Sequence, residues 1–279
     1  MSGPMGVADV RRKRLDLLLV ERGLVKSRER AKRLIMAGEV LVDGVPETKP
    51  GKKVPEDAPI QLKSPDIPYV SRGGLKLEGA LRDFGLDVSG MVALDVGAST
   101  GGFTDCLLQH GASFVYALDV GYGLLDWKLR RDPRVKPMER VNARYLRPDM
   151  FDRTIDLATV DVSFISLKLI LPPLSRVVRP GGLIIALVKP QFEAGREKVG
   201  RGGVVRDPEV HKEVLIELVE SAPKWGLRPL KLTYSPIKGP AGNIEFFLLF
   251  EVGGGEGQVN REEIERVVNE AHRKLSEEV

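Results

Sequence analysis

Cysteine and histidine are scarce in this 279-residue sequence, and their scarcity limits the chemistry that it can carry. The single cysteine, Cys106, excludes an internal disulfide and a cysteine-rich metal site, and it favours a reducing, cytoplasmic location. The three histidines, His110, His211 and His272, are scattered along the chain without the spacing of metal ligands. We therefore expect no metal site.

Long apolar runs are missing as well. The longest, at residues 183–188 and 246–250, are far shorter than the about 20 residues that a membrane-spanning helix needs. The first residues also lack the continuous apolar core of a signal peptide. We expect a protein that is neither secreted nor inserted into a membrane.

Positive charge is unevenly distributed along the chain. Residues 1–63 hold 14 Lys and Arg against 9 Asp and Glu, whereas the remaining residues hold 29 against 30. The whole excess of positive charge therefore lies at the N-terminus. Such asymmetry is typical of a protein that binds a polyanion, although a solvated surface helix explains the charge about equally well.

The length predicts one small and one large folding unit. We expect a small α+β domain over residues 1–63, a linker over residues 64–68 and a larger domain over residues 69–279, because the prolines of the linker disfavour a helix and stiffen the chain. In the small domain, a helix over residues 14–23 is closed by a glycine, and Ser27 caps a second helix that runs to Gly38.

The larger domain alternates helical patterns with short apolar runs. Helices are expected over residues 75–84, after the glycine turn at 97–102, near 122–130 and at 262–274. A strand and turn are expected over residues 40–46 in the small domain. In the larger domain, strands are expected from residue 92, at 114–119, and at 155–161, 183–189 and 244–250. This alternation predicts an α/β, Rossmann-like domain whose mostly parallel, doubly wound sheet has helices on both faces.

A glycine-rich turn between the strand at residue 92 and the helix after it is typical of a nucleotide-like ligand site. Its glycines let the backbone approach a ligand, and the helix that follows presents free N–H groups. The spacing G-x-x-x-G-G differs from the G-x-G-x-x-G of dinucleotide folds and favours S-adenosylmethionine over NAD. We expect cofactor contacts from Asp95, Gly97, Ala98, Ser99, Thr100, Gly101, Gly102 and Phe103. A tight turn of any α/β domain is the alternative.

A second acid supports the cofactor site. Asp119 ends the strand at residues 114–119, where ribose hydroxyls are bound in doubly wound sheets. Asn142 follows the next short apolar stretch and is expected to meet the adenine. Tyr122 and Trp127 are candidates for stacking on the adenine or on a flipped base, with core packing expected for at least one of them.

Four charged residues are candidates for the chemistry: Lys76 in the first helix after the linker, Asp161 and Lys189 at the ends of two strands, and Glu245 at the start of a third. Because the carboxyl ends of the strands line the ligand crevice of a doubly wound sheet, we expect Asp161 and Lys189 to face a bound cofactor. Methylation of a hydroxyl requires removal of its proton, or stabilisation of the negative charge that develops, while an electrophilic methyl group is held in line. A lysine serves either need, depending on its pKa. For each residue alone, a structural ion pair or a solvated strand end is the simpler reading.

The residues around these positions narrow the type of acceptor. Asp161 is followed by Val-Ser-Phe-Ile, not by the Pro-Pro-aromatic run of enzymes that methylate base amines. Cys106 lies in the helix beyond the glycine turn, not where a thiolate would attack a pyrimidine ring. A hydroxyl acceptor remains, and the RNA 2′-hydroxyl fits a chain with a basic N-terminal module.

Several motifs give the chain a resemblance to a known family. They are Arg14-Leu-Asp, Ser27-Arg-Glu-Arg-Ala, Gly38-Glu-Val-Leu-Val-Asp-Gly44, Tyr69-Val-Ser-Arg-Gly-Gly-Leu-Lys-Leu77, Gly97-Ala-Ser-Thr-Gly-Gly102, Val188-Lys-Pro-Gln-Phe192 and Asn243-Ile-Glu-Phe246. With them the chain resembles the TlyA family of ribosomal RNA methyltransferases over essentially its whole length. The N-terminal part resembles an RNA-binding module first described in a ribosomal small-subunit protein, and the rest resembles FtsJ-like 2′-O-methyltransferases.

The resemblance implies a class I methyltransferase fold, S-adenosylmethionine as cofactor, and cytidine 2′-hydroxyls of small- or large-subunit ribosomal RNA as substrate. It assigns the Lys-Asp-Lys-Glu tetrad of FtsJ-like enzymes to Lys76, Asp161, Lys189 and Glu245. RNA contacts are expected from Arg14, Ser27, Arg28, Lys32 and Arg33 of the N-terminal module. One departure is Asp43, which replaces the family's asparagine; aspartate supports the same turn, but a side-chain RNA contact there is in doubt.

Two rival functions stay open. TlyA relatives often carry a haemolysin label, and the terminal helix is a candidate for lying on a membrane, although its acids suit anionic lipids poorly. A non-catalytic RNA-binding protein with the same fold is the other. The glycine- and arginine-rich residues 193–207 are interpreted either as a mobile loop over RNA or as an ordinary surface loop.

Overall fold

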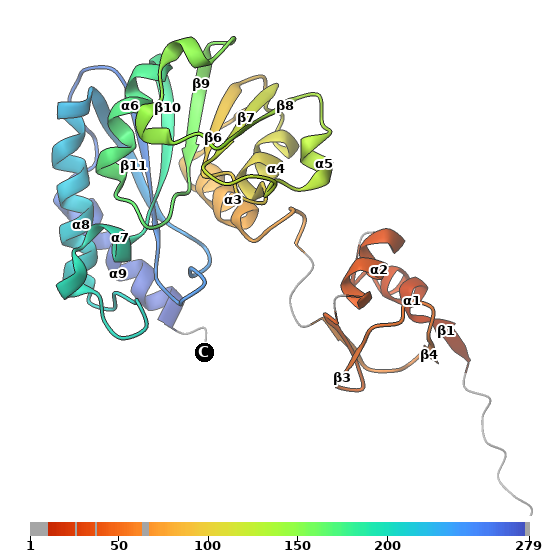
Figure 1. Ribbon diagram of the computed structural model, residues 1–279. Helices are drawn as coiled ribbons and strands as arrows, with labels where there is room; N and C mark the ends of the chain where they lie inside the picture. The colour runs from red at the N-terminus through yellow and green to blue at the C-terminus, as the bar shows by residue number, and fades with distance from the viewer. Residues whose placement is uncertain (1–10, 26, 37, 63–66, 277–279) are drawn as a thin grey trace, which may run out of the picture. The chain divides into compact units, whose positions relative to one another are not determined.

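The computed structural model of the protein divides into two compact units, Met1–Pro68 and Tyr69–Val279 (Figure 1). The described residues are 11–25, 27–36, 38–62 and 67–276. Residues 64–66 of the predicted linker therefore lie outside the described part of the chain. Each unit has its own hydrophobic core and is considered separately.

The described residues of the first unit form two helices, α1 (Leu15–Glu21) and α2 (Arg28–Met36). Gly23, with φ of 67°, follows the end of α1, as the glycine signal predicted. Ser27 caps α2, because its Oγ accepts a hydrogen bond from the Arg30 N–H at 3.2 Å. Apolar side chains of both helices pack with strand residues into one small core, made of Leu15, Leu18, Leu19, Val25, Ala31, Ile35, Val40, Val54, Ala58 and Ile60.

The strands of the first unit are only three residues long. Antiparallel pairing joins β1 (Arg12–Arg14) to β4 (Lys53–Pro55), and β2 (Val40–Val42) to both β3 (Val45–Glu47) and β5 (Ile60–Leu62). The turn between β2 and β3 places Asp43 at φ of 53° and Gly44 at φ of 77°. Both values lie in the left-handed region that such two-residue hairpin turns require, and aspartate tolerates it.

The second unit is built on a seven-stranded sheet with the order β11-β12-β10-β9-β6-β7-β8. The strands are β6 (Val92–Val96), β7 (Phe114–Asp119), β8 (Val135–Glu139), β9 (Ile155–Val160), β10 (Val178–Val188), β11 (Leu227–Tyr234) and β12 (Phe246–Val252). The five from β8 to β10 are parallel, and β12 runs antiparallel to both of its neighbours. The predicted mostly parallel, doubly wound sheet is confirmed.

Helices cover both faces of this sheet (Figure 1). One core contains side chains of α3 (Gly73–Phe84), α4 (Gly102–Gln109) and α5 (Trp127–Arg130). The opposite core contains side chains of α6 (Leu171–Val177), α8 (Pro208–Ser221) and α9 (Arg261–Ser276). Shorter helical segments are η1 (Ala143–Tyr145), η2 (Pro148–Met150), η3 (Leu167–Leu169), α7 (Pro190–Glu193), η4 (Arg196–Lys198) and η5 (Ala222–Trp225).

The two edge strands, β8 and β11, were not predicted. Each contains a proline, Pro137 in β8 and Pro229 in β11, and the pairing of β11 with β12 shifts register next to Pro229. Proline cannot donate a ladder hydrogen bond, so it argues against a strand in the sequence and is tolerated at a sheet edge. The helix expected near residues 122–130 is also shorter than predicted and covers only α5.

Candidate active site

A cavity of about 650 Å³ opens at the carboxyl ends of β6, β9 and β10. Between β6 and β9 the strand order reverses direction, and such a switch point is where doubly wound sheets bind their ligands. The cavity is lined by Ser71, Arg72, Gly73, Lys76, Gly97, Ala98, Ser99, Thr100, Gly102, Phe103, Asp161, Ser163, Phe164, Lys189, Gln191, Phe192, Gly202, Gly203, Lys238, Pro240, Ala241, Asn243 and Glu245.

The glycine turn forms one wall of the cavity, and its backbone requires glycine. Gly97 has φ of 83°, and a Cβ atom there would lie 2.3 Å from the backbone oxygen of Asp161. Gly101 has φ of 99°, and a Cβ atom there would lie 2.2 Å from a methyl group of Leu129. Six of the predicted cofactor-binding residues line the cavity: Gly97, Ala98, Ser99, Thr100, Gly102 and Phe103.

Asp95 was predicted to contact the cofactor, but its side chain is fully buried and does not line the cavity. Its Oδ2 accepts a hydrogen bond from Thr104 at 2.7 Å, and its Oδ1 accepts one from Thr159 at 3.2 Å. Burial raises the pKa of this carboxyl to about 7. Asp95 therefore ties β6 to α4 and β9 beneath the glycine turn.

Two further predicted cofactor residues lie near the turn without lining the cavity. The carboxylate of Asp119 accepts the Ser99 N–H at 2.8 Å and the Gly121 N–H at 2.7 Å, so it orders the loops on either side of it. The exposed Asn142 accepts the Arg144 N–H at 3.0 Å and caps η1. Direct contacts of these two side chains with a cofactor stay predictions.

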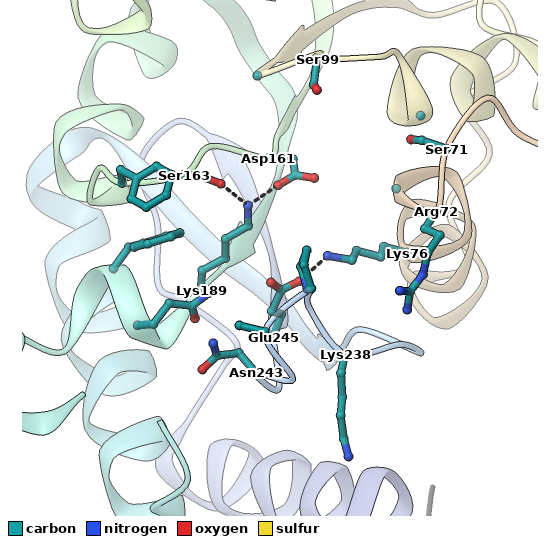
Figure 2. Close-up of a pocket in the computed structure, with 18 of the residues that line it drawn as sticks. Ser71, Arg72, Lys76, Ser99, Asp161, Ser163, Lys189, Lys238, Asn243 and Glu245 are labelled. Atoms are coloured by element: carbon teal, nitrogen blue, oxygen red, sulfur yellow. Dashed lines mark hydrogen bonds and ion pairs between the residues drawn. The ribbon is translucent and has the colours of Figure 1, made fainter. Parts of the chain in front are cut away.

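Lys76 and Glu245 form one buried ion pair in the cavity (Figure 2). Lys76 comes from α3, and Glu245 directly precedes β12, whose antiparallel direction brings its first residues to the carboxyl edge of the parallel strands. Lys76 Nζ lies 2.5 Å from Glu245 Oε2, and the two side chains are 9% and 1% exposed. Burial raises the pKa of Glu245, and the charge of Lys76 opposes that rise.

Lys189 and Asp161 form a second ion pair in the same cavity. Figure 2 shows Lys189 reaching from the end of β10 towards the end of β9. Its Nζ lies 2.6 Å from Asp161 Oδ1 and donates to Ser163 Oγ at 3.0 Å. The structure thus brings all four predicted catalytic residues to one cavity, as two lysine–carboxylate pairs beside the glycine turn.

Several cavity residues had no role assigned from the sequence. Asn243 is buried and joins two parts of the wall, because its Oδ1 accepts the Val205 N–H at 3.0 Å and its Nδ2 donates to the Gly203 carbonyl at 2.9 Å. The loop after α7 is therefore anchored where its glycines meet the cavity. Asn243, like Ser71 and Arg72, lies inside a motif of the family resemblance, which was the available signal.

Phe164 gave no signal in the sequence. It is 90% exposed, has φ of 62° and lies with its ring centroid 5.0 Å from that of Phe192 at the cavity. A bulky residue in the left-handed region is uncommon and is more frequent at functional sites. Neither its exposure nor its backbone conformation is encoded by a local pattern. Tyr122 and Trp127 are each 68% exposed, so the expectation that at least one of them packs in the core is wrong.

One polar atom of the cavity wall has no partner within the described residues. The Oε1 atom of Gln191 is buried and accepts no hydrogen bond there. A buried acceptor without a donor is costly, so its place at the cavity fits a ligand that carries an N–H or O–H group.

The predicted RNA-binding residues of the first unit form a different kind of cluster. Arg14 and Arg28 each approach the fully buried Asp16 at 2.9 Å, and their side chains stay 41% and 45% exposed. The hydrogen bond from Arg14 is the main reason that the pKa of Asp16 falls to about 2. Lys32 is half-buried, and the side chain of Arg33 lies outside the described part of the chain.

Within the described ranges, no helix is long and apolar enough to cross a membrane. In the same ranges, no group of three or more His, Cys, Asp or Glu side chains is arranged to hold a metal ion.

Each unit matches the model of a known protein family. Residues 69–252 match the FtsJ-like methyltransferase model, and residues 13–60 match the S4 domain model. The chain is 53% identical over 272 residues to YqxC of Bacillus subtilis, named as a candidate rRNA methyltransferase, with 96% of each chain covered. It is 46% identical over 239 residues to the 16S/23S rRNA (cytidine-2′-O)-methyltransferase TlyA of Mycobacterium tuberculosis, covering 85% of this chain and 89% of the relative.

Other relatives carry a different name. Hemolysin A of Brachyspira hyodysenteriae is 43% identical over 238 residues, covering 85% of this chain and 99% of the relative. A solved structure from Streptococcus thermophilus, described as a candidate hemolysin, matches this chain with a TM-score of 0.76 and 46% sequence identity. The match covers 96% of this chain and 98% of the solved chain. Together with the site geometry, these matches show that the chain belongs to the FtsJ-like methyltransferase family, in the TlyA group that joins this domain to an S4 domain.

Proposed function

We propose that the protein transfers the methyl group of S-adenosylmethionine to a ribose 2′-hydroxyl of ribosomal RNA, with cytidine as the modified nucleoside. Membership of the FtsJ-like family and the names of the TlyA relatives support the reaction and the substrate. The observation that carries the proposal is the convergence of two lysine–carboxylate pairs on one cavity beside a glycine turn. A cytoplasmic location follows from such a substrate.

The glycine turn and the start of α4 would hold the cofactor. The turn lines the cavity through Gly97 and Gly102 together with Ser99 and Thr100, and α4 directs its free N–H groups towards it. The unpartnered Oε1 of Gln191 would accept a donor of the bound ligands. S-adenosylmethionine supplies an electrophilic methyl carbon on a positively charged sulfur.

Lys189 would act on the ribose oxygen. An ammonium group has three N–H donors, and those of Lys189 are directed at Asp161 and Ser163, which leaves one for the cavity. That donor would hold the 2′-oxygen and stabilise the negative charge that develops on it. The oxygen would form its bond to the methyl carbon as the bond from that carbon to sulfur breaks, and its proton would pass to solvent water. Lys76 and Glu245, buried opposite, would fix the direction from which the ribose approaches.

The first unit would hold the RNA. Its S4 match and its exposed Arg14 and Arg28 support contacts with RNA phosphates. Ser27 and Lys32 lie at the start of α2 and within it, so we add them to the RNA-binding residues. Arg33 is added from the sequence alone. We place the border between RNA-binding and catalytic domains at residues 64–68, as the sequence predicts.

The Lys189→Ala variant tests the reaction. Methyl transfer to ribosomal RNA should fall about 100- to 1000-fold, because a preorganised donor to the reacting oxygen is lost, while calorimetry with S-adenosylmethionine gives nearly the same dissociation constant. Lys168→Ala is the matched control, since Lys168 lies on η3 and pairs with the exposed Glu217 of α8. Full turnover in Lys189→Ala would remove this residue from the mechanism.

The two rival functions make other predictions. A non-catalytic RNA-binding protein would give no heat with S-adenosylmethionine. A membrane-acting protein would release dye from lipid vesicles, yet the apolar face of α9 is packed in the core through Ile264, Val267, Val268 and Ala271. The terminal helix is therefore not available to lie on a membrane in this fold.

A further inference from the structure

Two of the three histidines form a buried pair in the second unit that the proposed reaction does not use. His211 of α8 is fully buried, and its Nδ1 lies 2.9 Å from Nε2 of His272 on α9. The ring of His211 also packs edge-on against Phe246, the first residue of β12, with 5.4 Å between the ring centroids. Both nitrogens of a buried imidazole need partners, so the partner of the second nitrogen decides what the pair can hold.

The second nitrogen of His211 holds a backbone carbonyl. Its Nε2 lies 3.2 Å from the carbonyl oxygen of Val205, a residue that is itself buried. A carbonyl only accepts, so Nε2 carries the proton of the neutral ring, and Nδ1 accepts from Nε2 of His272. Burial lowers the pKa of His211 to about 4, which keeps the ring neutral at neutral pH. His272 thus fixes the tautomer in which His211 donates to Val205.

Val205 belongs to the loop between η4 and α8, residues 199–206, which we call the wall loop. Gly202 and Gly203 of this loop line the cavity, with φ of 78° and 75°. The Gly203 N–H donates to the Gly200 carbonyl at 3.1 Å, so the chain turns tightly where it meets the cavity. Because Val205 directly follows this turn, its position sets the position of this part of the cavity wall.

Asn243 connects the wall loop to the active site. Its side chain accepts the Val205 N–H at 3.0 Å and donates to the Gly203 carbonyl at 2.9 Å. Figure 2 shows Asn243 beside Glu245 and far from Ser99 of the glycine turn. The wall loop therefore borders the end of the cavity that the proposed function gives to the ribose.

We propose that His211 is a positioning residue for the RNA substrate, which holds the wall loop through Val205 and so shapes the ribose end of the cavity. The inference rests on the proposed function, since it concerns how the ribose reaches Lys189. Without the donor of His211, the carbonyl of Val205 would be a buried acceptor without a partner, which is costly. The carbonyl would turn towards water and take Gly202 and Gly203 with it. The loss should fall on the RNA substrate and not on the cofactor, because the glycine turn lies at the other end of the cavity.

The first experiment removes the hydrogen bond and keeps the ring. His211→Phe retains a ring against Phe246 but has no donor for Val205. The KM for ribosomal subunits that lack the modification should rise about tenfold, while kcat falls less than about threefold and the Kd for S-adenosylmethionine stays within about twofold. His110→Phe is the matched control, since His110 Nδ1 lies 2.8 Å from the Cys106 carbonyl and His110 does not line the cavity. An unchanged KM in folded His211→Phe would overturn the proposal.

Two further variants separate positioning from a general loss of stability. His211→Gln places an amide N–H the same number of bonds from Cβ as the Nε2–H of histidine, so it should restore KM to within about threefold of the unchanged protein. Leu218→Ala opens a space in the core beside α8 and lowers stability without removing a hydrogen bond of the wall loop. Its KM should stay unchanged. A KM as high as that of His211→Phe, or no rescue by His211→Gln, would leave His211 with a structural role only.

A double variant tests whether His211 and Asn243 act on the same loop. Asn243→Ala removes the hydrogen bonds to the Val205 N–H and the Gly203 carbonyl, so it should also raise KM. Because the two changes release one loop, His211→Phe combined with Asn243→Ala should raise KM by less than the product of the single effects. Effects that multiply fully would contradict a shared action through Val205.

The tautomer of His211 is measurable without any activity. The chain has three histidines, so the imidazole nitrogen signals in an NMR spectrum are few, and His211→Phe identifies those of His211 by their loss. At neutral pH the proton should lie on Nε2, and a proton on Nδ1 would overturn the proposal. A protein that transfers no methyl group would remove the proposed function whatever the tautomer. Methyl transfer with a normal KM in His211→Phe would remove only the positioning role.

Discussion

The candidate functional sites of the two units place their charged side chains in opposite ways. In the first unit the acid is buried and its cations are at the surface: Asp16 is fully buried between the half-exposed Arg14 and Arg28. In the cavity of the second unit the cations are withdrawn with their acids, as in the buried pair of Lys76 and Glu245. The first arrangement holds positive charge where a polyanion can reach it, and the second concentrates charge at one cavity.

The hydrophobic cores of the two units also differ, in their size. The first unit combines three-residue strands with one small cluster of apolar side chains. The second has strands of up to eleven residues and an apolar core on each face of its sheet. Small cores provide little stability, so a single ion pair matters more to the fold of the first unit, whereas the second can tolerate buried charges for function.

The largest effect is expected from breaking the buried pair. Lys76→Met should reduce methyl transfer about 100-fold and lower the free energy of unfolding by about 3 kcal/mol, because Glu245 is left buried without its cation. The double variant Lys76→Met with Glu245→Met should recover most of that stability without recovering activity. Turnover and thermal unfolding measure the two quantities; if the double variant were active, the pair would be structural.

Next comes the glycine turn. Gly97→Ala should lower the free energy of unfolding by about 3 kcal/mol and abolish cofactor binding, because the added Cβ meets the backbone of Asp161 at a φ of 83°. Gly85→Ala is the matched control, with φ of 61° and nothing within 4 Å of the added Cβ, and should cost about 1 kcal/mol. Equal losses in chemical denaturation would show that backbone strain alone matters at Gly97.

The pH dependence of the second unit should reveal its buried acid. Asp95 has a pKa raised to about 7, so the folded state prefers the protonated carboxyl, and stability should fall as pH rises from about 4 to 7. Asp95→Asn should remove this fall, which we expect to be on the order of 2 kcal/mol. A pH series of unfolding curves measures it, and an unchanged slope in the variant would assign the fall to other groups.

The smallest effect is expected in the first unit, where stability should fall as the pH is lowered and not as it is raised. Asp16 has a pKa lowered to about 2, so its contribution is complete above about pH 4 and is lost as pH falls towards 2. At pH 7 Asp16→Asn should destabilise this unit by about 1 kcal/mol, since both arginines are partly exposed to solvent. Hydrogen exchange restricted to residues 11–62 measures the loss, and no loss would mean that the arginines contribute only to binding.

Local pattern predicted the parts of the fold that carry strong periodic signals. The parallel strands and the glycine turn follow from apolar runs and from glycines that the backbone requires, as at Gly97. The edge strands β8 and β11 were missed because Pro137 and Pro229 interrupt their patterns.

The site was only partly predictable for a related reason. Spacing brings Asp161 and Lys189 to one sheet edge, since both follow parallel strands. The pairing of Lys76 with Glu245 depends on an antiparallel strand and a helix that lie far apart in the sequence, and it was not predicted. The family resemblance suggested only that the two residues belong to one site. The burial of Asp95 and the backbone conformation of Phe164 depend on tertiary packing, which no short pattern encodes.

The most direct measurement is the fate of a labelled methyl group. Purified protein, S-adenosylmethionine labelled in its methyl group and ribosomal subunits that lack the modification should yield ribosomal RNA with the label on a cytidine 2′-oxygen, identified by mass spectrometry of its nucleosides. Label on a nucleobase, or its absence from RNA while the cofactor is bound, would contradict the assignment of Lys189 and its partners to a ribose hydroxyl.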